Sequence, residues 1–125
     1  MGNPKVILIV DDEPEARKQA AAVVGRLGYA VLTANNGDHA LALYERLRAP
    51  IDLLLVDVTV PGLSGPMLAE RMKARQPGLR VLYTSAIQRS LVVRKYVVER
   101  GGALLPKPFT SDQLRARVEA AVLST

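Results

Sequence analysis

Apolar and polar positions along the chain alternate between two kinds of segment. Each of five short apolar runs is followed by a longer segment that carries apolar residues at helical spacing. Apolar runs bounded by turn residues are typical of parallel strands that are buried on both faces. The pattern therefore predicts five strands, each followed by a helix, with the strands at residues 5–10, 30–34, 52–56, 80–85 and 103–105.

Proline, glycine and capping residues set the limits of the predicted helices. Pro14 stands where a first helical turn tolerates proline, and the helix that follows ends at Gly28. Asp38 is predicted to cap a second helix, which Pro50 stops. The other three helices are expected near 66–75, at 89–100, and from a cap at Thr110 or Ser111 through Leu123.

This order of elements predicts an α/β fold. Alternating strands and helices with right-handed crossovers form a parallel sheet that is covered by helices on both faces. The expected architecture is a flavodoxin-like, doubly wound, five-stranded parallel sheet of order 2-1-3-4-5 with five helices. With 125 residues and an apolar share of 49%, residues 1–125 are expected to form a single domain.

Composition narrows the function classes. The net charge is +5, but the basic residues are scattered over several helical faces, which argues against direct binding to nucleic acid. The sequence has no cysteine, which excludes disulfides and thiolate chemistry. No long apolar span or signal peptide is present, so we expect a cytoplasmic chain without membrane contact.

Three carboxylates follow the two strands that flank the predicted switch point of the sheet. Asp11 and Asp12 come after the first strand, and Asp57 ends the third. Ligand sites in such sheets lie outside the carboxyl ends of these strands, so the three groups are expected to converge. They would repel one another unless a hard cation neutralised them, and Mg²⁺ is the natural candidate, with the Thr59 carbonyl as a further ligand.

Two more functional groups follow the neighbouring strands. A hydroxyl of Ser85, or of its neighbour Thr84, comes after the fourth strand, and Lys107 comes after the fifth. A metal, a hydroxyl and an ammonium group around one carboxylate are what phosphoryl transfer to that carboxylate requires. Asp57 is therefore a candidate nucleophile that carries an acyl phosphate.

With these residues in place, the chain resembles the receiver (response-regulator) domains of two-component phosphorelay systems over nearly its whole length. The resemblance rests on Asp11-Asp12, on Asp57 in LLLVDVTVPGLSG, on Ser85-Ala86 and on Lys107 in LLPKPFT. Ser85 lies 28 residues (85 − 57) and Lys107 lies 50 residues (107 − 57) after Asp57, which is close to the spacing in receivers.

The resemblance implies a role for each site residue. Asp57 would accept phosphate from a phosphohistidine on a histidine kinase or histidine phosphotransfer protein, and the domain would catalyse only its own phosphorylation and dephosphorylation. The metal ligands would be Asp11, Asp12, Asp57 and Thr59, with Asp12 in the inner shell and Asp11 acting through water. Ser85 and Lys107 would contact the phosphoryl group, and the Lys107-Pro108 bond would be cis.

One position departs from the family pattern. Receivers often carry Tyr or Phe three residues before the lysine, and this chain has Leu104 there, so a rotamer switch is expected to be absent or muted. The helix at 89–100 is apolar on more than one face. The face built by this helix, the strand at 103–105 and the last helix is therefore a candidate surface for a partner or a homodimer.

Two alternatives stay open. An aspartyl-phosphate phosphatase of the haloacid-dehalogenase type also uses Asp, Mg²⁺, Ser or Thr, and Lys, but it resembles D-x-D where this chain has Asp57-Val58-Thr59. No effector domain follows Thr125, so the chain is expected to be either a stand-alone receiver or a fragment. The phrases RVLYTS and LLPKPFT resemble receivers of hybrid sensor kinases.

Overall fold

The computed structural model describes residues 4–86, 95, 97–99 and 102–123. Strands and helices alternate along the described chain, and each strand lies within a few residues of its predicted position. The elements are β1 (Val6–Val10), α1 (Pro14–Arg26), β2 (Ala30–Ala34), α2 (Gly37–Leu47), β3 (Leu53–Asp57), α3 (Gly65–Arg75), β4 (Val81–Ala86), β5 (Ala103–Lys107) and α5 (Ser111–Leu123).

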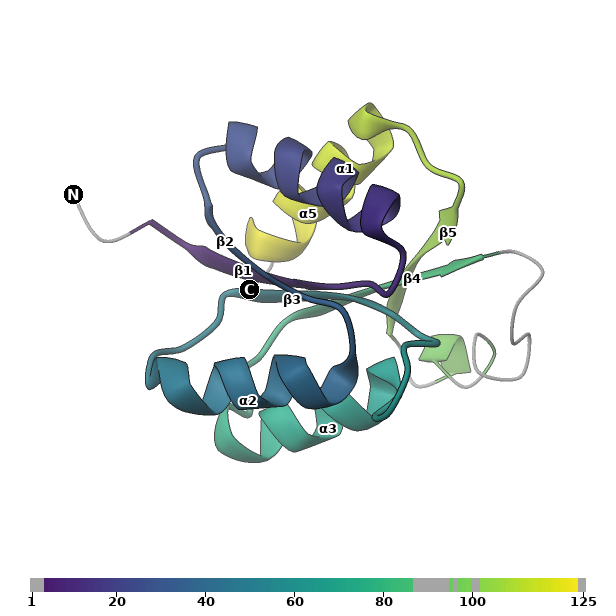
Figure 1. The fold of residues 1–125 in the computed structure, drawn as a ribbon. Coiled ribbons are helices and arrows are strands. Elements are labelled where there is room, and N and C mark those ends of the chain that lie inside the picture. Colours follow the sequence, from purple (N-terminus) through teal and green to yellow (C-terminus); the bar gives the residue numbers. More distant parts are fainter. Residues whose placement is uncertain (1–3, 87–94, 96, 100–101, 124–125) are drawn as a thin grey trace.

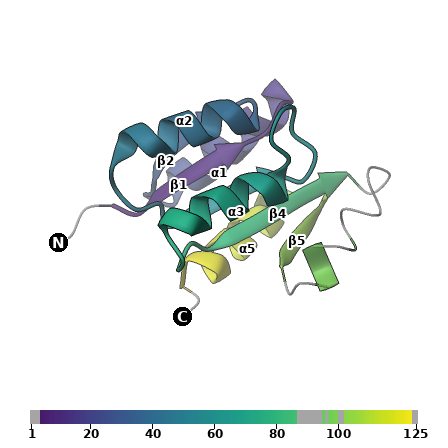
Figure 2. The same cartoon turned by 90° about the horizontal axis from the view of Figure 1, so that it is seen from below.

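All five strands form one parallel sheet in the order β2-β1-β3-β4-β5, which confirms the predicted fold class. Helices α1 and α5 cover one face of the sheet, and α2 and α3 cover the other (Figure 1). The view from below shows α2 and α3 side by side, with β1 and β4 running behind them (Figure 2). Most of the helix predicted at 89–100 lies outside the described residues; Lys95 and residues 97–99 are helical.

Alternation along the central strands supplies two apolar cores. In β1, Leu8 and Val10 point to the side of α2 and α3, whereas Ile7 and Ile9 point to α1 and α5. Every residue of β3 is buried. A strand between two helical layers needs apolar side chains on both faces, which is why the central strands appear in the sequence as unbroken apolar runs.

Two helices show which residues cap their N-termini, α2 against the prediction and α5 in agreement with one of two candidates. Asp38 does not cap α2; Asn36 does, and its side chain accepts a hydrogen bond of 2.7 Å from the His39 N–H. Thr110, one of the two candidates, caps α5. Its Oγ1 accepts from the N–H of Gln113 at 3.0 Å, while the Gln113 side chain accepts from the Thr110 N–H at 2.9 Å.

Candidate functional site

The three predicted carboxylates meet at the carboxyl edge of the sheet. Strands β1 and β3 are neighbours, and Val10 pairs with Val56, so the residues that follow them lie side by side. Ligand oxygens of Asp11, Asp12 and Asp57 all lie within 4.8 Å of one another. Asp11 is 6% exposed and Asp57 is 2% exposed, so two of the three charges lie under the surface.

Lys107 reaches the same cluster from the end of β5. Its Nζ donates to Asp57 Oδ2 at 2.7 Å and to Asp11 Oδ2 at 2.8 Å, and it lies 3.5 Å from Glu13 Oε1. Only 13% of the Lys107 side chain is exposed. The Lys107-Pro108 peptide bond is cis, as the resemblance implied. The ammonium group therefore bridges two buried carboxylates.

Burial and charge act in opposite directions on these groups. Burial raises the pKa of Asp11 above its ordinary value, although the hydrogen bonds from Lys107 and from the Glu13 N–H work against this rise. Burial alone would lower the pKa of Lys107, but its hydrogen bonds to Asp11 and Asp57 outweigh burial and raise the pKa above 10.5. The Lys107 ammonium group therefore stays protonated, whereas burial makes the ionised form of Asp11 less favourable than it would be in water.

Thr59 contacts the candidate nucleophile through two donors. Its backbone N–H lies 2.9 Å and its hydroxyl 3.1 Å from Asp57 Oδ1. Both oxygens of Asp57 are therefore hydrogen-bonded, Oδ1 by Thr59 and Oδ2 by Lys107. These contacts fix the orientation of the carboxylate. The sequence pointed to the Thr59 carbonyl only, although a threonine two residues after an aspartate is typical of such a local turn.

The donor set fits a divalent cation. Asp12 Oδ1 is buried and has no hydrogen-bond partner among the described residues, which is costly unless a further group binds it. Three carboxylates and one ammonium leave two negative charges when all are ionised. Mg²⁺ carries the opposite charge and prefers oxygen ligands. Asp11, Asp12 and Asp57 are therefore suited to hold it.

The predicted hydroxyl group of Ser85 lies at the end of β4, the strand beside β3, but its hydrogen bond is to a neighbouring residue. Ser85 is fully buried, and its Oγ donates to the Ala86 carbonyl at 3.2 Å. Within the described part of the chain, no hydrogen bond joins Ser85 to Asp57. Thr84 is the residue that pairs with Asp57 across β3 and β4. The alternative between Ser85 and Thr84 thus stays open in this arrangement.

Two contacts at the site were not predicted. The carboxylate of Glu13 adds a more exposed negative charge near Lys107, with 57% of its side chain exposed. Arg17 Nη1 donates to the Asp11 carbonyl at 2.8 Å and so ties α1 to the turn after β1. A helical arginine six residues after Asp11 carries no distinctive spacing signal, so only the three-dimensional structure reveals its contact.

Gly65 lets α3 begin against the backbone of the candidate nucleophile. A Cβ on Gly65 would lie 2.6 Å from the Asp57 carbonyl oxygen and 3.0 Å from Val58 Cα. Both obstructing atoms belong to the backbone and have little room to move.

We expect Gly65→Ala to lower the free energy of unfolding by about 2 kcal/mol, because the added methyl group overpacks this contact. Gly78→Ala is the matched control, since a Cβ there would meet nothing within 4 Å. Urea denaturation of both variants measures the difference. Equal stability of the two variants would contradict the close approach at Gly65.

The fold is a doubly wound α/β sheet with a carboxylate cluster at its carboxyl edge, and comparison with known proteins gives the family. The sequence model of the response regulator receiver domain matches residues 7–119. The chain therefore belongs to the response regulator receiver family.

Curated relatives combine this domain with further sequence. The chain is 37% identical over 118 residues to a positive alginate biosynthesis regulatory protein of Pseudomonas aeruginosa. The matched region covers 92% of this chain and 46% of the relative. It is 28% identical over 113 residues to the sensor kinase CckA of Brucella abortus, covering 90% of this chain and 12% of the kinase. The chain thus spans less than half the length of these two relatives.

Solved structures agree with the fold. The receiver domain of NtrX from Brucella abortus superposes with a TM-score of 0.82 at 31% identity, covering 95% of this chain and 99% of that one. A CheY-like receiver domain protein from Methanospirillum hungatei gives a TM-score of 0.83 at 25% identity, with coverage of 96% and 94%.

These findings decide between the receiver and the haloacid-dehalogenase type of phosphatase. The chain is a receiver of phosphorelay signal transduction, the kind of signalling module found in response regulators and hybrid kinases. The comparisons give no support to the haloacid-dehalogenase alternative. In the part of the chain that the structure describes, no helix has the length and apolar character needed to cross a bilayer.

Proposed function

We propose that Asp57 accepts a phosphoryl group from a phosphohistidine in a Mg²⁺-dependent reaction that the domain itself catalyses. The observation that carries this proposal is the bridging contact of Lys107. One ammonium group lies within 2.8 Å of oxygens of both Asp11 and Asp57, at a buried edge rich in carboxylates. The proposed nucleophile thus has an ammonium group and further carboxylates beside it, and phosphoryl transfer requires such charged groups around the reacting atoms.

In the proposed reaction, a carboxylate oxygen of Asp57 attacks the phosphorus of the donor. A P–O bond forms, the P–N bond to the donor imidazole breaks, and the imidazole keeps its electron pair and takes up a proton. Thr59 holds the carboxylate in orientation through its N–H. The Lys107 ammonium is placed to neutralise a phosphoryl oxygen, since it already contacts Asp57 Oδ2.

Three of this chain's carboxylates are proposed to hold the metal, with the Thr59 carbonyl as a fourth ligand. Mg²⁺ supplies charge neutralisation at the phosphoryl oxygens when it is bound. Ser85 or Thr84 is proposed to donate a hydroxyl hydrogen bond to the phosphoryl group. Hydrolysis of the acyl phosphate is assigned to the same site, so the domain acts only on its own modification.

Asp12→Ala is expected to weaken Mg²⁺ binding more than Asp11→Ala. Asp12 has a buried oxygen without a partner, whereas the oxygens of Asp11 already accept from Glu13 N–H and Lys107. Losing an inner ligand should cost on the order of 10-fold more affinity than losing an outer one. Isothermal titration of the folded variants measures this, and equal losses would refute the division of roles.

The wider context is proposed from the family. The phosphodonor is a histidine kinase or a histidine phosphotransfer protein, the domain covers residues 1–125, and the compartment is the cytoplasm. A homodimer through the face that includes β5 and α5 is proposed as the output contact. Most of the helix predicted at 89–100, which would complete this face, lies outside the described residues, and so does most of its predicted apolar surface.

A further inference from the structure

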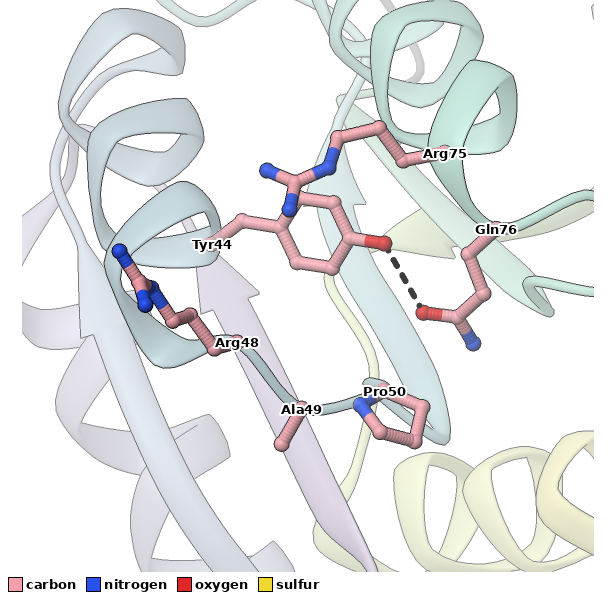
Figure 3. A pocket seen from close by; sticks show the side chains of 6 residues that line it. All are labelled: Tyr44, Arg48, Ala49, Pro50, Arg75 and Gln76. Carbon is pink, nitrogen blue, oxygen red and sulfur yellow. Dashed lines mark hydrogen bonds between the residues drawn. The ribbon is translucent and has the colours of Figure 1, made fainter.

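A hollow opens at the edge of the sheet opposite to Asp57. It lies where α2 and α3 end and the chain turns into β3, and it has a volume of about 320 Å³. Figure 3 shows its lining side chains, with the Arg75 guanidinium over the Tyr44 ring and Gln76 hydrogen-bonded to the Tyr44 hydroxyl. The lining residues are Tyr44, Arg48, Ala49, Pro50, Arg75 and Gln76.

The floor of the hollow is held rigidly. Gln76 Oε1 accepts from the Tyr44 hydroxyl and from the Ile51 N–H, both at 3.1 Å. Gln76 Nε2 donates to the Ile51 carbonyl at 2.7 Å. Because Tyr44 is 6% exposed, its ring is part of the core and not a mobile surface group. The two helix ends and the turn before β3 therefore form one fixed frame around the hollow.

The two arginines that line the hollow are exposed. Among the residues that the structure describes, neither Arg48 nor Arg75 forms an ion pair. Cations are favoured near helix C-termini, and this interaction involves Arg46 in the last turn of α2 and both Lys73 and Arg75 in the last turn of α3. Arg75 thus also contributes at the end of its own helix, while its guanidinium group lies over the Tyr44 ring beside the hollow.

Arg48 also occupies an unusual backbone position. Its φ of 53° and ψ of 27° lie in the left-handed region, where glycine is the favoured residue at the end of a helix. Arg48 is the one non-glycine residue with positive φ within the described ranges. Arginine is less favourable than glycine in this backbone conformation, so the backbone does not explain why an arginine stands here.

We propose that this hollow binds an acidic segment of a partner protein, with carboxylates at Arg48 and Arg75. Guanidinium groups pair well with carboxylates, and a rigid frame lowers the ordering cost of binding. The apolar parts of Ala49 and Pro50 suit the stems of the acidic side chains. The net charge of +5 favours an acidic partner further.

An acidic protein fits this hollow better than a nucleic acid does. Binding of single-stranded nucleic acid relies on exposed aromatic rings for base stacking. Tyr44, the aromatic residue in the hollow, is buried, and Arg75 lies 5.3 Å from its ring centroid. The proposed contact also lies away from the phosphoacceptor edge, so it stands independently of the role of Asp57.

The test uses a fluorescent peptide of alternating Glu and Gly, with a Gln and Gly peptide as its neutral counterpart. Anisotropy measures affinity for the whole 125-residue chain, and amide chemical shifts locate the contact. We expect the acidic peptide to perturb the last turns of α2 and α3. The double variant Arg48→Gly/Arg75→Gln should bind roughly tenfold more weakly, as expected for two lost surface ion pairs.

A matched control separates the hollow from general electrostatics. Arg46→Gln/Arg71→Gln removes the same charge from the same two helices, but neither residue lines the hollow. This control should keep nearly the affinity of the wild type. Arg48→Gly alone should not lower the melting temperature, because glycine favours the backbone conformation at that position.

Three outcomes would overturn the proposal. These are an absence of binding by the wild type, an equal loss of affinity in the control pair, and tighter binding of random-sequence DNA than of the acidic peptide at the same salt concentration. The last result would assign the arginines to a nucleic acid.

Discussion

Replacing Asp57 with Asn is expected to abolish covalent labelling by a small phosphodonor such as acetyl phosphate. The amide keeps the shape of the side chain but lacks the nucleophilic oxygen and a metal-binding charge. Loss of a nucleophile that acts directly on the reacting atom lowers rates on the order of 10⁴-fold or more. Intact-mass spectrometry after incubation with Mg²⁺ and the donor measures the labelled fraction.

The fold of the Asp57→Asn variant should survive. Asp57 ends a fully buried strand, and the amide oxygen can still accept from the Thr59 N–H. Asp112→Asn is a suitable control, because that carboxylate is 86% exposed and does not belong to the carboxylate cluster. The control should label like the wild type. Retained phosphate on a folded Asp57→Asn variant would place the acceptor at another residue.

Replacing Lys107 with Met should destabilise the metal-free protein by about 3 kcal/mol near neutral pH, since it leaves two buried carboxylates without their cation. Methionine keeps most of the stem, so the loss reports on charge more than on packing. Urea denaturation in the presence of a chelator gives the difference. Adding Mg²⁺ should recover part of it.

The pH dependence of this difference follows from the two pKa shifts. Because the folded protein raises the pKa of Lys107 above 10.5, its stabilising contribution is complete below that pH and is lost as the pH rises through the folded-state pKa. Burial raises the pKa of Asp11, so without the ammonium its ionised form costs more still. The deficit of Lys107→Met should therefore fade as the pH falls through the carboxyl range.

A stability deficit for Lys107→Met that did not change with pH would contradict this electrostatic origin. Loss of packing around the lysine stem would then be the better explanation. Lys107→Ala separates the two effects further, because it removes the stem as well as the charge. It should be less stable than Lys107→Met by a margin that does not depend on pH.

The strands and the carboxylate cluster could be predicted because both follow from local pattern and sheet topology. An unbroken apolar run such as residues 53–56 is compatible with a strand covered on both faces, and the switch point then places Asp11 beside Asp57. The N-terminal cap of α2 was harder to predict from the sequence. Asn36 and Asp38 are both good capping residues, and the sequence pattern alone does not choose between them.

Side-chain contacts at the site were largely beyond the sequence. Spacing places Lys107 near Asp57, but its simultaneous hydrogen bond to Asp11 depends on how β5 sits in the sheet. The rotamer of Ser85 is likewise set by its surroundings and not by its position in the chain. Leu104 pairs with Tyr83 across β4 and β5, and its predicted effect on switching stays a prediction.

Direct localisation of the phosphoryl group tests the assignment of Asp57 best. Borohydride reduces an aspartyl phosphate to homoserine, so treating the labelled wild-type chain and sequencing its peptides by mass spectrometry identifies the acceptor. We predict homoserine at residue 57, present with Mg²⁺ and the phosphodonor and absent when a chelator replaces the metal. Homoserine at Asp11 or Asp12, or labelling that does not depend on Mg²⁺, would contradict the assignment.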